Sequence, residues 1–340
     1  MGKVVAITGS RAGVGRATAE EFAKHGWDLG LMARDLPRLE TAAAELRRTY
    51  GVRTVAVATD VADPEAVEAA AERIERELGP IDVWVNVAMA TVFAPVAETT
   101  PAEFKRATEV TYLGQVYGTM AALRSMRPRN RGTIVNVGSA LAYRAIPLQA
   151  AYCGAKFAIR GFTDSLRSEI FHDKLNIHLT MVHLPAVNTP QFEWALNKTG
   201  RQAQPVPPIF QPEVPARAIY FAATHRRREV WVGFPTVKVI LANSIAPGLI
   251  DRYLAKAGYS GQLMNQPHSA SAPNNLFEPV DGPYGAHGRF DARARRGSWE
   301  MVISRNRGAF WAGALALLVA GAAAFANGRS GTRRTLLPRE

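Results

Sequence analysis

Seven short apolar runs, separated by stretches rich in Ala, Glu and Arg, constrain the fold of this chain more than any other feature. Continuous apolar runs that alternate with helical stretches are typical of parallel strands whose two faces are both covered by helices. The sequence therefore predicts an α/β domain with a doubly wound, parallel sheet of seven strands. The expected strands are Val4–Ile7, Asp28–Met32, Thr54–Ala58, Val83–Asn86, Thr133–Val137, His178–His183 and Val230–Val232.

The domain is expected to cover residues 1–258. Beyond Tyr259 the sequence has the periodicity of neither strand nor helix, and its Gly, Pro, Ser and Asn content is typical of a linker, so we expect a linker or extension over 259–308. Within it, Gly285–Asp291 (Gly-Ala-His-Gly-Arg-Phe-Asp) is unusual. A surface turn is the simpler interpretation of this motif, and a functional site is the alternative.

An apolar run, Ala309–Ala326, contains no charged side chain. A helix of this length spans about 27 Å, close to the roughly 30 Å of a bilayer's hydrocarbon core. We predict a transmembrane helix over 309–326, followed by a basic tail over 327–340. A buried or interfacial helix is the alternative, and Ala supplies half of the run and little driving force for insertion.

Charge favours a lipid membrane over nucleic acid as the partner. The formal net charge is +12, and residues 289–340 carry ten Arg against three acidic residues. This excess brackets the apolar run, whereas a nucleic-acid face normally lies on the folded body. The N-terminus enters the first strand directly, so we expect no secretory signal and a cytoplasmic body.

Composition excludes several classes of protein. With 47% hydrophobic and 21% charged residues, the chain is neither disordered nor a disulfide-built miniprotein. Cys153 is the single cysteine, and the seven His show no metal-ligand spacing, so we expect no metal site. Packing is the simpler role for Cys153, and His178 and His183 are expected to be ordinary strand residues.

A glycine-rich turn, Thr8–Gly15, closes the first strand and opens a helix. Glycines let the backbone approach a pyrophosphate, and a helix N-terminus offers it unpaired N–H groups. We therefore expect this turn to bind a dinucleotide. The candidate residues are Gly9, Ser10, Arg11, Gly13, Val14 and Gly15.

Tyr152 and Lys156 lie four residues apart, on one face of a predicted helix, and Ser139 ends the strand before it. A hydride transfer at a carbonyl carbon needs a proton donor at the oxygen. A nearby ammonium can lower the pKa of a phenol by stabilising the phenolate, and a serine can hold the same oxygen. The three side chains therefore predict carbonyl–alcohol chemistry.

With these motifs the sequence resembles the short-chain dehydrogenases/reductases, over roughly Lys3 to Gly233. The resemblance implies catalytic roles for Ser139, Tyr152 and Lys156, and it places Thr111 where the family has a fourth catalytic residue, an asparagine that holds a proton-relay water. It also implies a family habit of pairing through helices, hence a possible homo-oligomer. The further cofactor contacts that it implies are Asp60, Val61, Asn86, Ala88, Tyr152, Lys156, Val187 and Thr189.

The end of the second strand bears on the choice of cofactor. Arg34, with Arg11 in the glycine turn, resembles the family's NADP pattern, because arginine attracts the 2′-phosphate. Asp35 follows directly and keeps NAD(H) possible. We expect NADP(H) to be favoured.

The sequence thus predicts an NADP(H)-dependent oxidoreductase acting on a hydrophobic alcohol or ketone, anchored to a membrane by its C-terminal helix. The segment Gln191–Gln211, rich in aromatic residues and Pro, lies where the family has its substrate lid, although a plain connection is the alternative. One competing function is a catalytically weak, nucleotide-binding membrane scaffold or redox sensor. Another is a soluble enzyme with a buried C-terminal helix.

Overall fold

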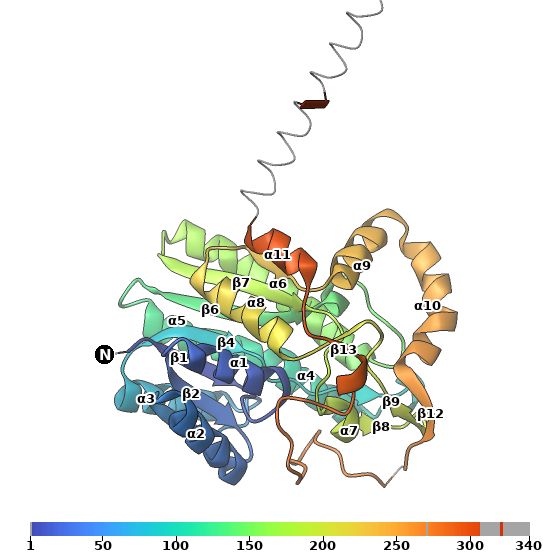
Figure 1. Ribbon diagram of the computed structural model, residues 1–340, viewed down its shortest axis with the longest axis horizontal. Helices are drawn as coiled ribbons and strands as arrows, with labels where there is room; N and C mark the ends of the chain where they lie inside the picture. Colours follow the sequence, from blue (N-terminus) through green and yellow to red (C-terminus); the bar gives the residue numbers. More distant parts are fainter. Residues whose placement is uncertain (1, 270, 307–319, 322–340) are drawn as a thin grey trace, which may run out of the picture. The chain divides into compact units, whose positions relative to one another are not determined.

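A seven-stranded, wholly parallel sheet organises the chain (Figure 1). Its strand order is β11-β7-β6-β4-β1-β2-β3, so the chain reverses direction across the sheet between β1 and β4. Such a switch point opens a crevice at the carboxyl ends of the strands. The predicted sheet is confirmed. Its strands are β1 (Val4–Thr8), β2 (Asp28–Ala33), β3 (Thr54–Ala58), β4 (Ile81–Asn86), β6 (Gly132–Ser139), β7 (Ile177–Leu184) and β11 (Glu229–Trp231).

The computed structural model describes residues 2–269, 271–306 and 320–321. Met1–Ser298 form one compact unit, and a second unit begins at Trp299 and includes α11 (Trp299–Arg305). The predicted transmembrane helix over 309–326 lies outside the described residues, apart from 320–321. Within the described part of the chain, no helix combines the length and apolarity needed to cross a bilayer.

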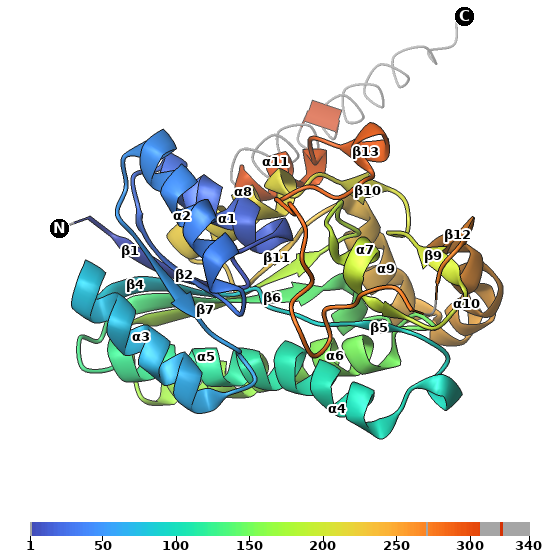
Figure 2. The ribbon, with the colours of Figure 1, turned by 90° about the horizontal axis from the view of Figure 1, so that it is seen from below.

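Helices cover both faces of the sheet (Figure 2). The first group packs on one face and comprises α1 (Gly13–Lys24), α2 (Leu36–Tyr50) and α8 (Glu213–Thr224). The second packs on the other face and comprises α3 (Pro64–Leu78), α5 (Gly114–Met126) and α6 (Ala150–His172), with α4 (Pro101–Thr108) beside α6. This double cover is the physical reason that the central strands are apolar on both sides.

Aspartate caps fix where two of these helices begin. The side chain of Asp35 accepts a hydrogen bond from Arg38 N at the start of α2, and that of Asp63 accepts one from Ala66 N at the start of α3. Each cap satisfies one of the backbone N–H groups that a helix leaves free at its start. At its other end α2 stops at Gly51, whose φ of 69° suits glycine.

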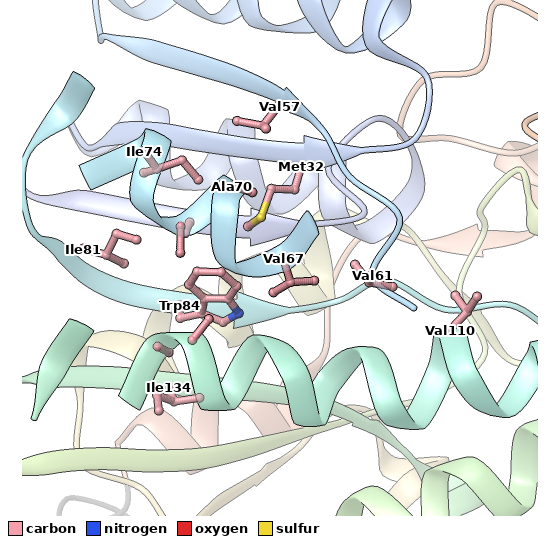
Figure 3. Packing of buried hydrophobic residues seen from close by; sticks show 14 of the residues in the cluster. Met32, Val57, Val61, Val67, Ala70, Ile74, Ile81, Trp84, Val110 and Ile134 are labelled. Carbon is pink, nitrogen blue, oxygen red and sulfur yellow. The ribbon is translucent and has the colours of Figure 1, made fainter. Parts of the chain in front are cut away.

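One buried core cluster lies between the sheet and helices α3 and α5 (Figure 3). Trp84 and Ile74 are fully buried there. A Cβ on Gly30 would lie 2.6 Å from Ile74 Cδ1, so the glycine in β2 lets α3 approach the sheet closely. Val61 and Val110 occupy one end of the cluster (Figure 3), nearest the carboxyl ends of the strands.

Further strands, helices and turns outside the seven-stranded sheet and its covering helices were not predicted. Strands of two to five residues carry too little periodicity to be recognised, and they pair with segments that are remote in sequence. The strand pairs are β5 (Val92–Phe93) with β8 (Leu196–Asn197), β9 (Arg201–Ala203) with β12 (Leu263–Pro267), and β10 (Ile209–Phe210) with β13 (Ala294–Arg295). The helices and turns are α7 (Gln191–Trp194), α9 (Phe234–Ile245), α10 (Pro247–Gln262), η1 (Val96–Glu98), η2 (Glu109–Leu113), η3 (Ala140–Ala142) and η4 (Asp291–Arg293).

The stretch assigned to a linker packs against the body as far as Ser298. Its strands β12 and β13 pair with β9 and β10, and Leu276 and Phe290 are buried. Its partners lie up to about 270 residues earlier in the chain, as in the bonds from Arg11 to Val280 O, so local periodicity could not reveal them. We call residues 274–291 the strap.

Candidate active site

The glycine turn Gly9–Gly15 connects β1 to α1 at the switch point. Gly9 and Gly13 have φ values of 67° and 56°, which favour glycine. A Cβ on Gly15 would lie 2.1 Å from Gly9 O, so the first turn of α1 rests directly on the loop. The helix N-terminus therefore faces the crevice, as a phosphate-binding turn requires. Ser10, by contrast, is buried, and its hydroxyl donates to Met32 O within the body.

The structure brings Ser139, Tyr152 and Lys156 together. Ser139 is the last residue of β6, and the other two lie in the first turns of α6. Lys156 Nζ lies 5.5 Å from the centre of the Tyr152 ring and donates a hydrogen bond of 2.7 Å to Val137 O. A side-chain hydrogen bond joins Ser139 to Tyr152. A phenol, a hydroxyl and an amine thus meet at the carboxyl end of the strand.

Burial dominates the electrostatics of this trio. It raises the pKa of Tyr152 well above the ordinary value, and the hydrogen bond from Ser139 opposes only part of this rise. Burial also lowers the pKa of Lys156 to about 7. The expectation that the ammonium lowers the phenol's pKa is therefore wrong for the chain alone. Near neutrality much of Lys156 is uncharged, and an amine without charge cannot stabilise a phenolate.

Thr111, expected in a relay, is fully buried in η2 and is bound to the backbone of Ala90. Its hydroxyl donates to Ala90 O at 2.8 Å and accepts from Ala90 N at 2.9 Å. A hydroxyl has one proton and two lone pairs, so one lone pair remains. Thr111 can accept a hydrogen bond from a water but cannot donate one, unlike the family's asparagine.

A buried polar network lies behind Ser139 and was not predicted from the sequence. His183 is fully buried; its Nδ1 lies 3.2 Å from Ser139 O, and its Nε2 lies 3.5 Å from Glu229 Oε2. Tyr143 and Trp231 also donate hydrogen bonds to Glu229. Burial would raise the pKa of Glu229, but the bonds from His183, Tyr143 and Trp231 lower it far below its usual range. His183 therefore lies between the end of β6 and Glu229 of β11.

Charged residues gather at the tips of β2 and β3. Arg11 Nη1 lies 2.5 Å from Asp35 Oδ2, so the carboxylate that kept NAD(H) possible is already paired with an arginine. Arg34 stands beside them, and burial lowers its pKa. Asp60 pairs with Arg106 and accepts from Ala62 N at the end of β3.

Three residues that the resemblance implies as cofactor contacts lie at this edge, each in a different environment. Asn86 is fully buried, and its amide donates to Gln115 O, Thr119 Oγ1 and Asn136 Oδ1, so it cross-links β4, α5 and β6 instead of facing the crevice. Ala88 lies against the glycine turn, with its Cα 2.9 Å from where a Cβ on Gly9 would be. Val61 is buried within the core cluster.

The loop after β7 completes the crevice. Val187 forms a bridge to Phe210, and Thr189 lies beside the glycine turn, since a Cβ on Gly13 would be 3.3 Å from Thr189 Cβ. The proposed lid, Gln191–Gln211, folds into α7, β8, β9 and β10, with Trp194 and Phe210 buried.

Two other expectations concern Cys153 and metals. Cys153 is buried next to Ile146 O, and burial raises the pKa of its thiol to about 11, as expected of a packing residue. In the part of the chain that the structure describes, no group of three His, Cys, Asp or Glu residues could hold a metal ion.

Comparisons with known proteins agree on one family. The family model described as short chain dehydrogenase matches residues 3–199. An uncharacterized oxidoreductase of Bacillus subtilis, YxnA, is 32% identical over 289 residues, which cover 84% of this chain and 80% of the relative. A 3-dehydrosphinganine reductase of Danio rerio is 33% identical over 196 residues, 56% of this chain and 58% of the relative. L-sorbose reductase from Gluconobacter frateurii, solved with NADPH and L-sorbose, matches with a TM-score of 0.61 and 28% identity, covering 68% of this chain and 95% of that one.

Lys156 predicts a pH-dependent stability. Its pKa of about 7 in the folded chain lies below the ordinary 10.5, so between these values the unfolded chain binds more protons and the free energy of unfolding rises with pH. The cost of burying the ammonium is complete below about pH 7 and is relieved as the pH rises. Each pH unit of this interval is worth about 1.4 kcal/mol.

We expect Lys156→Met to remove this dependence. The free energy of unfolding of the variant, relative to wild type, should fall by roughly 3 kcal/mol between about pH 7 and pH 9.5 in urea titrations. Lys105→Met, at an exposed site, is the control and should show no such trend. A difference between variant and wild type that stays constant with pH would contradict the assigned pKa of Lys156.

Proposed function

Because the chain belongs to the short-chain dehydrogenase/reductase family, we propose that it transfers a hydride between NADP(H) and a hydrophobic alcohol or ketone. The observation that carries this proposal is the convergence of Ser139, Tyr152 and Lys156 at the carboxyl end of β6. A proton donor, an oxygen-binding hydroxyl and an amine are the groups that carbonyl–alcohol chemistry needs in one place.

The residues at the switch point fit NADP(H). The N–H of Gly13 already donates to a backbone oxygen, Gly285 O, at 3.0 Å, so it is directed out of the turn toward an acceptor. Arg34 likewise donates to two backbone oxygens, a geometry that also suits the 2′-phosphate. Asp35 is paired with Arg11 and is less available to a free 2′-hydroxyl, which favours NADP(H) over NAD(H). The similar L-sorbose reductase, which was solved in complex with NADPH, supports the same choice.

The side chains of the trio favour reduction. The bound nicotinamide supplies or accepts the hydride. With its pKa raised, Tyr152 stays protonated near neutrality and can donate its proton to a carbonyl oxygen, while the Ser139 hydroxyl donates a hydrogen bond to the same oxygen. Lys156, held by Val137 O, stabilises the resulting tyrosinate when it carries a proton. In the oxidative direction Tyr152 would have to lose its proton first, which its burial disfavours.

A lipophilic substrate is supported by the surroundings of the site. Phe93, Phe192 and Phe290 lie in edge-to-face or tilted contact beside the loop after β7. The similarity to a 3-dehydrosphinganine reductase points in the same direction, since that name denotes a ketone on a lipid backbone. We therefore propose a ketone with a long apolar chain.

Membrane anchoring is proposed on two grounds. The first is the uncharged run Ala309–Ala326 with arginines on both sides. The second is a set of exposed apolar side chains on α9 and α10, which are Leu241, Ile245, Leu249 and Tyr253, with Ile245 83% exposed. Exposed basic residues accompany them, namely Lys238, Arg252 and Lys256. An apolar face with basic neighbours suits an anionic lipid surface, and we propose that the catalytic domain is cytoplasmic.

The competing proposal, a catalytically weak scaffold or redox sensor, is favoured by one observation. Thr111 has no proton left to donate to a relay water. The intact trio favours the enzyme, and the experiment on Tyr152 separates the two.

Tyr152→Phe tests the chemistry. We expect this variant to lose about 10²–10⁴-fold in kcat/KM for reduction of a panel of lipophilic ketones, because the proton donor is gone. Tyr259→Phe, at an exposed residue of α10, is the matched control and should keep its turnover. Equal turnover by the Tyr152 variant would contradict the proposed role. NADPH binding by wild type without turnover of any ketone would favour the scaffold.

Arg34→Ala tests the choice of cofactor. Loss of a charge-assisted bond to the 2′-phosphate should lower the ratio of kcat/KM with NADPH to that with NADH by about 10–100-fold. A ratio cancels effects that are common to both cofactors. Arg48→Ala, on the exposed face of α2, should leave the ratio unchanged. An unaltered ratio for Arg34→Ala would place the 2′-phosphate elsewhere or exclude NADP(H).

Truncation tests the anchor. Residues 1–298 form a compact unit, so a chain that ends at Ser298 keeps the strap in place. We expect the full chain to remain in carbonate-washed membranes and the truncated chain to be released from them. Release of both would favour the soluble enzyme with a buried C-terminal helix.

A further inference from the structure

The strap follows the groove assigned to NADP(H) from one end to the other. Its residues meet the groups expected to bind the adenine, the 2′-phosphate, the pyrophosphate and the nicotinamide in the order of the dinucleotide. The successive contacts are Leu276 beside Arg106 and Asp60, Phe277 on Arg34, Val280 on Arg11, Gly285 on Gly13, and Gly288 on Thr189. In Figures 1 and 2 the orange ribbon that follows β12 accordingly passes close to α7.

At the adenine end the strap inserts a leucine. Leu276 is 0% exposed and joins the same buried cluster as Val61 and Val110. Its carbonyl accepts a bond of 3.2 Å from Arg106 Nε, and Arg106 also pairs with Asp60. An apolar side chain thus fills the place beside Val61 that the family resemblance gives to adenine.

At the phosphate positions the strap presents backbone oxygens. Arg34 donates to the carbonyls of Asn275 and Phe277, each at 2.5 Å, and Arg11 donates to Val280 O at 3.3 Å. The Gly13 N–H donates to Gly285 O at 3.0 Å. These carbonyls stand where the oxygens of a 2′-phosphate and a pyrophosphate would accept the same bonds.

The motif Gly285–Asp291 anchors the strap to the loop after β7. A Cβ on Gly288 would lie 2.5 Å from Thr189 O, so glycine is needed for this approach. Asn188 donates to Asp291 Oδ1 at 2.8 Å and accepts from Phe290 N at 2.9 Å. His287 lies 2.7 Å from Asp291 Oδ1 and 2.6 Å from Glu213 Oε1, which ties the anchor to α8. The motif is therefore a clasp between the strap and the body.

We propose that residues 275–285 are an autoinhibitory segment that must leave the groove before NADP(H) can bind, while the anchor, residues 287–291, stays in place. This inference rests on the proposed function, because it takes the cofactor site as given. The Gly13 N–H has one proton, so it cannot bind both Gly285 O and a phosphate oxygen. Leu276 occupies the place that is assigned to the adenine. The strap and the cofactor therefore cannot occupy the groove together. Phosphate oxygens carry charge and bind arginine more strongly than neutral carbonyls do, so the cofactor can displace the strap.

The closed strap lowers the apparent affinity for NADPH by the fraction of open molecules. Because the strap contributes backbone oxygens to these bonds, no side-chain substitution within the strap removes them. Substitution of the buried Leu276 side chain is therefore the way to weaken the strap without changing the cofactor-binding arginines. We expect Leu276→Ser to tighten NADPH binding by about tenfold or more in calorimetric titrations. Phe171→Ser, at a residue of α6 that lies outside the strap and is 72% exposed, is the matched control and should bind as wild type does.

Hydrogen–deuterium exchange of the wild-type chain gives a second measurement that needs no variant. NADPH should accelerate exchange across residues 275–285 and leave 287–291 protected. Slower exchange across 275–285 with NADPH, or weaker binding by Leu276→Ser, would overturn the proposal and identify the strap as a cover over the cofactor. In that case the proposed function would stand, because NADPH still binds. If neither protein binds NADPH, both the proposed cofactor and the autoinhibition fail.

Discussion

Burial of the sheet on both faces is the constraint from which the rest of this structure follows. Every residue of β1 is buried, as is nearly every residue of β4. Some polar side chains in such strands are paired inside, as Asn86 is with Asn136, and others lie at the strand ends. Ser139 at the end of β6 and the glycine turn after β1 meet at that edge because the strands are parallel. The site is therefore a consequence of the topology, and the switch point between β1 and β4 provides its crevice.

Lys156 shows how the same burial shapes chemistry. Lys156 is 2% exposed, and its amine donates one hydrogen bond to Val137 O. Because burial removes it from water, the charged form of the amine is disfavoured. Desolvation also favours the neutral form of Tyr152 beside it, which is half-buried. Without a cofactor, Tyr152 therefore keeps the proton that it can donate. A negatively charged dinucleotide in the crevice would favour the charged form of Lys156. Behind the pair, His183 Nδ1 lies 3.2 Å from Ser139 O and His183 Nε2 lies 3.5 Å from Glu229 Oε2, so buried polar groups lie against the end of β6.

The sequence predicted the strands and motifs whose signals lie within a few residues of one another. It did not predict contacts between residues that are distant in the chain. Seven apolar runs were enough to define the sheet, and a turn, a strand end and an i, i+4 pair were enough to place Gly13, Ser139 and Tyr152. The side-chain partners of Asn86 could not be predicted, because only packing reveals that its amide binds α5 and β6. Glu229 could not be found, since no periodicity links it to His183 on the neighbouring strand. A buried histidine in an otherwise apolar strand, at His183, was the one available hint.

The strap explains why a stretch with the composition of a linker can be so closely bound. Linker composition indicates a lack of apolar periodicity, but residues 275–285 of the strap are held in part by their own carbonyl oxygens, which every sequence possesses. Those oxygens accept hydrogen bonds from arginines and from the N–H of Gly13. The side chains of His287 and Asp291 add bonds at the anchor. Two buried side chains, Leu276 and Phe290, and the clasp Gly285–Asp291 fix the position of this segment. The groove assigned to a dinucleotide can thus also hold an extended peptide. Each of these two ligands presents a row of oxygen acceptors that ends in a flat or apolar group.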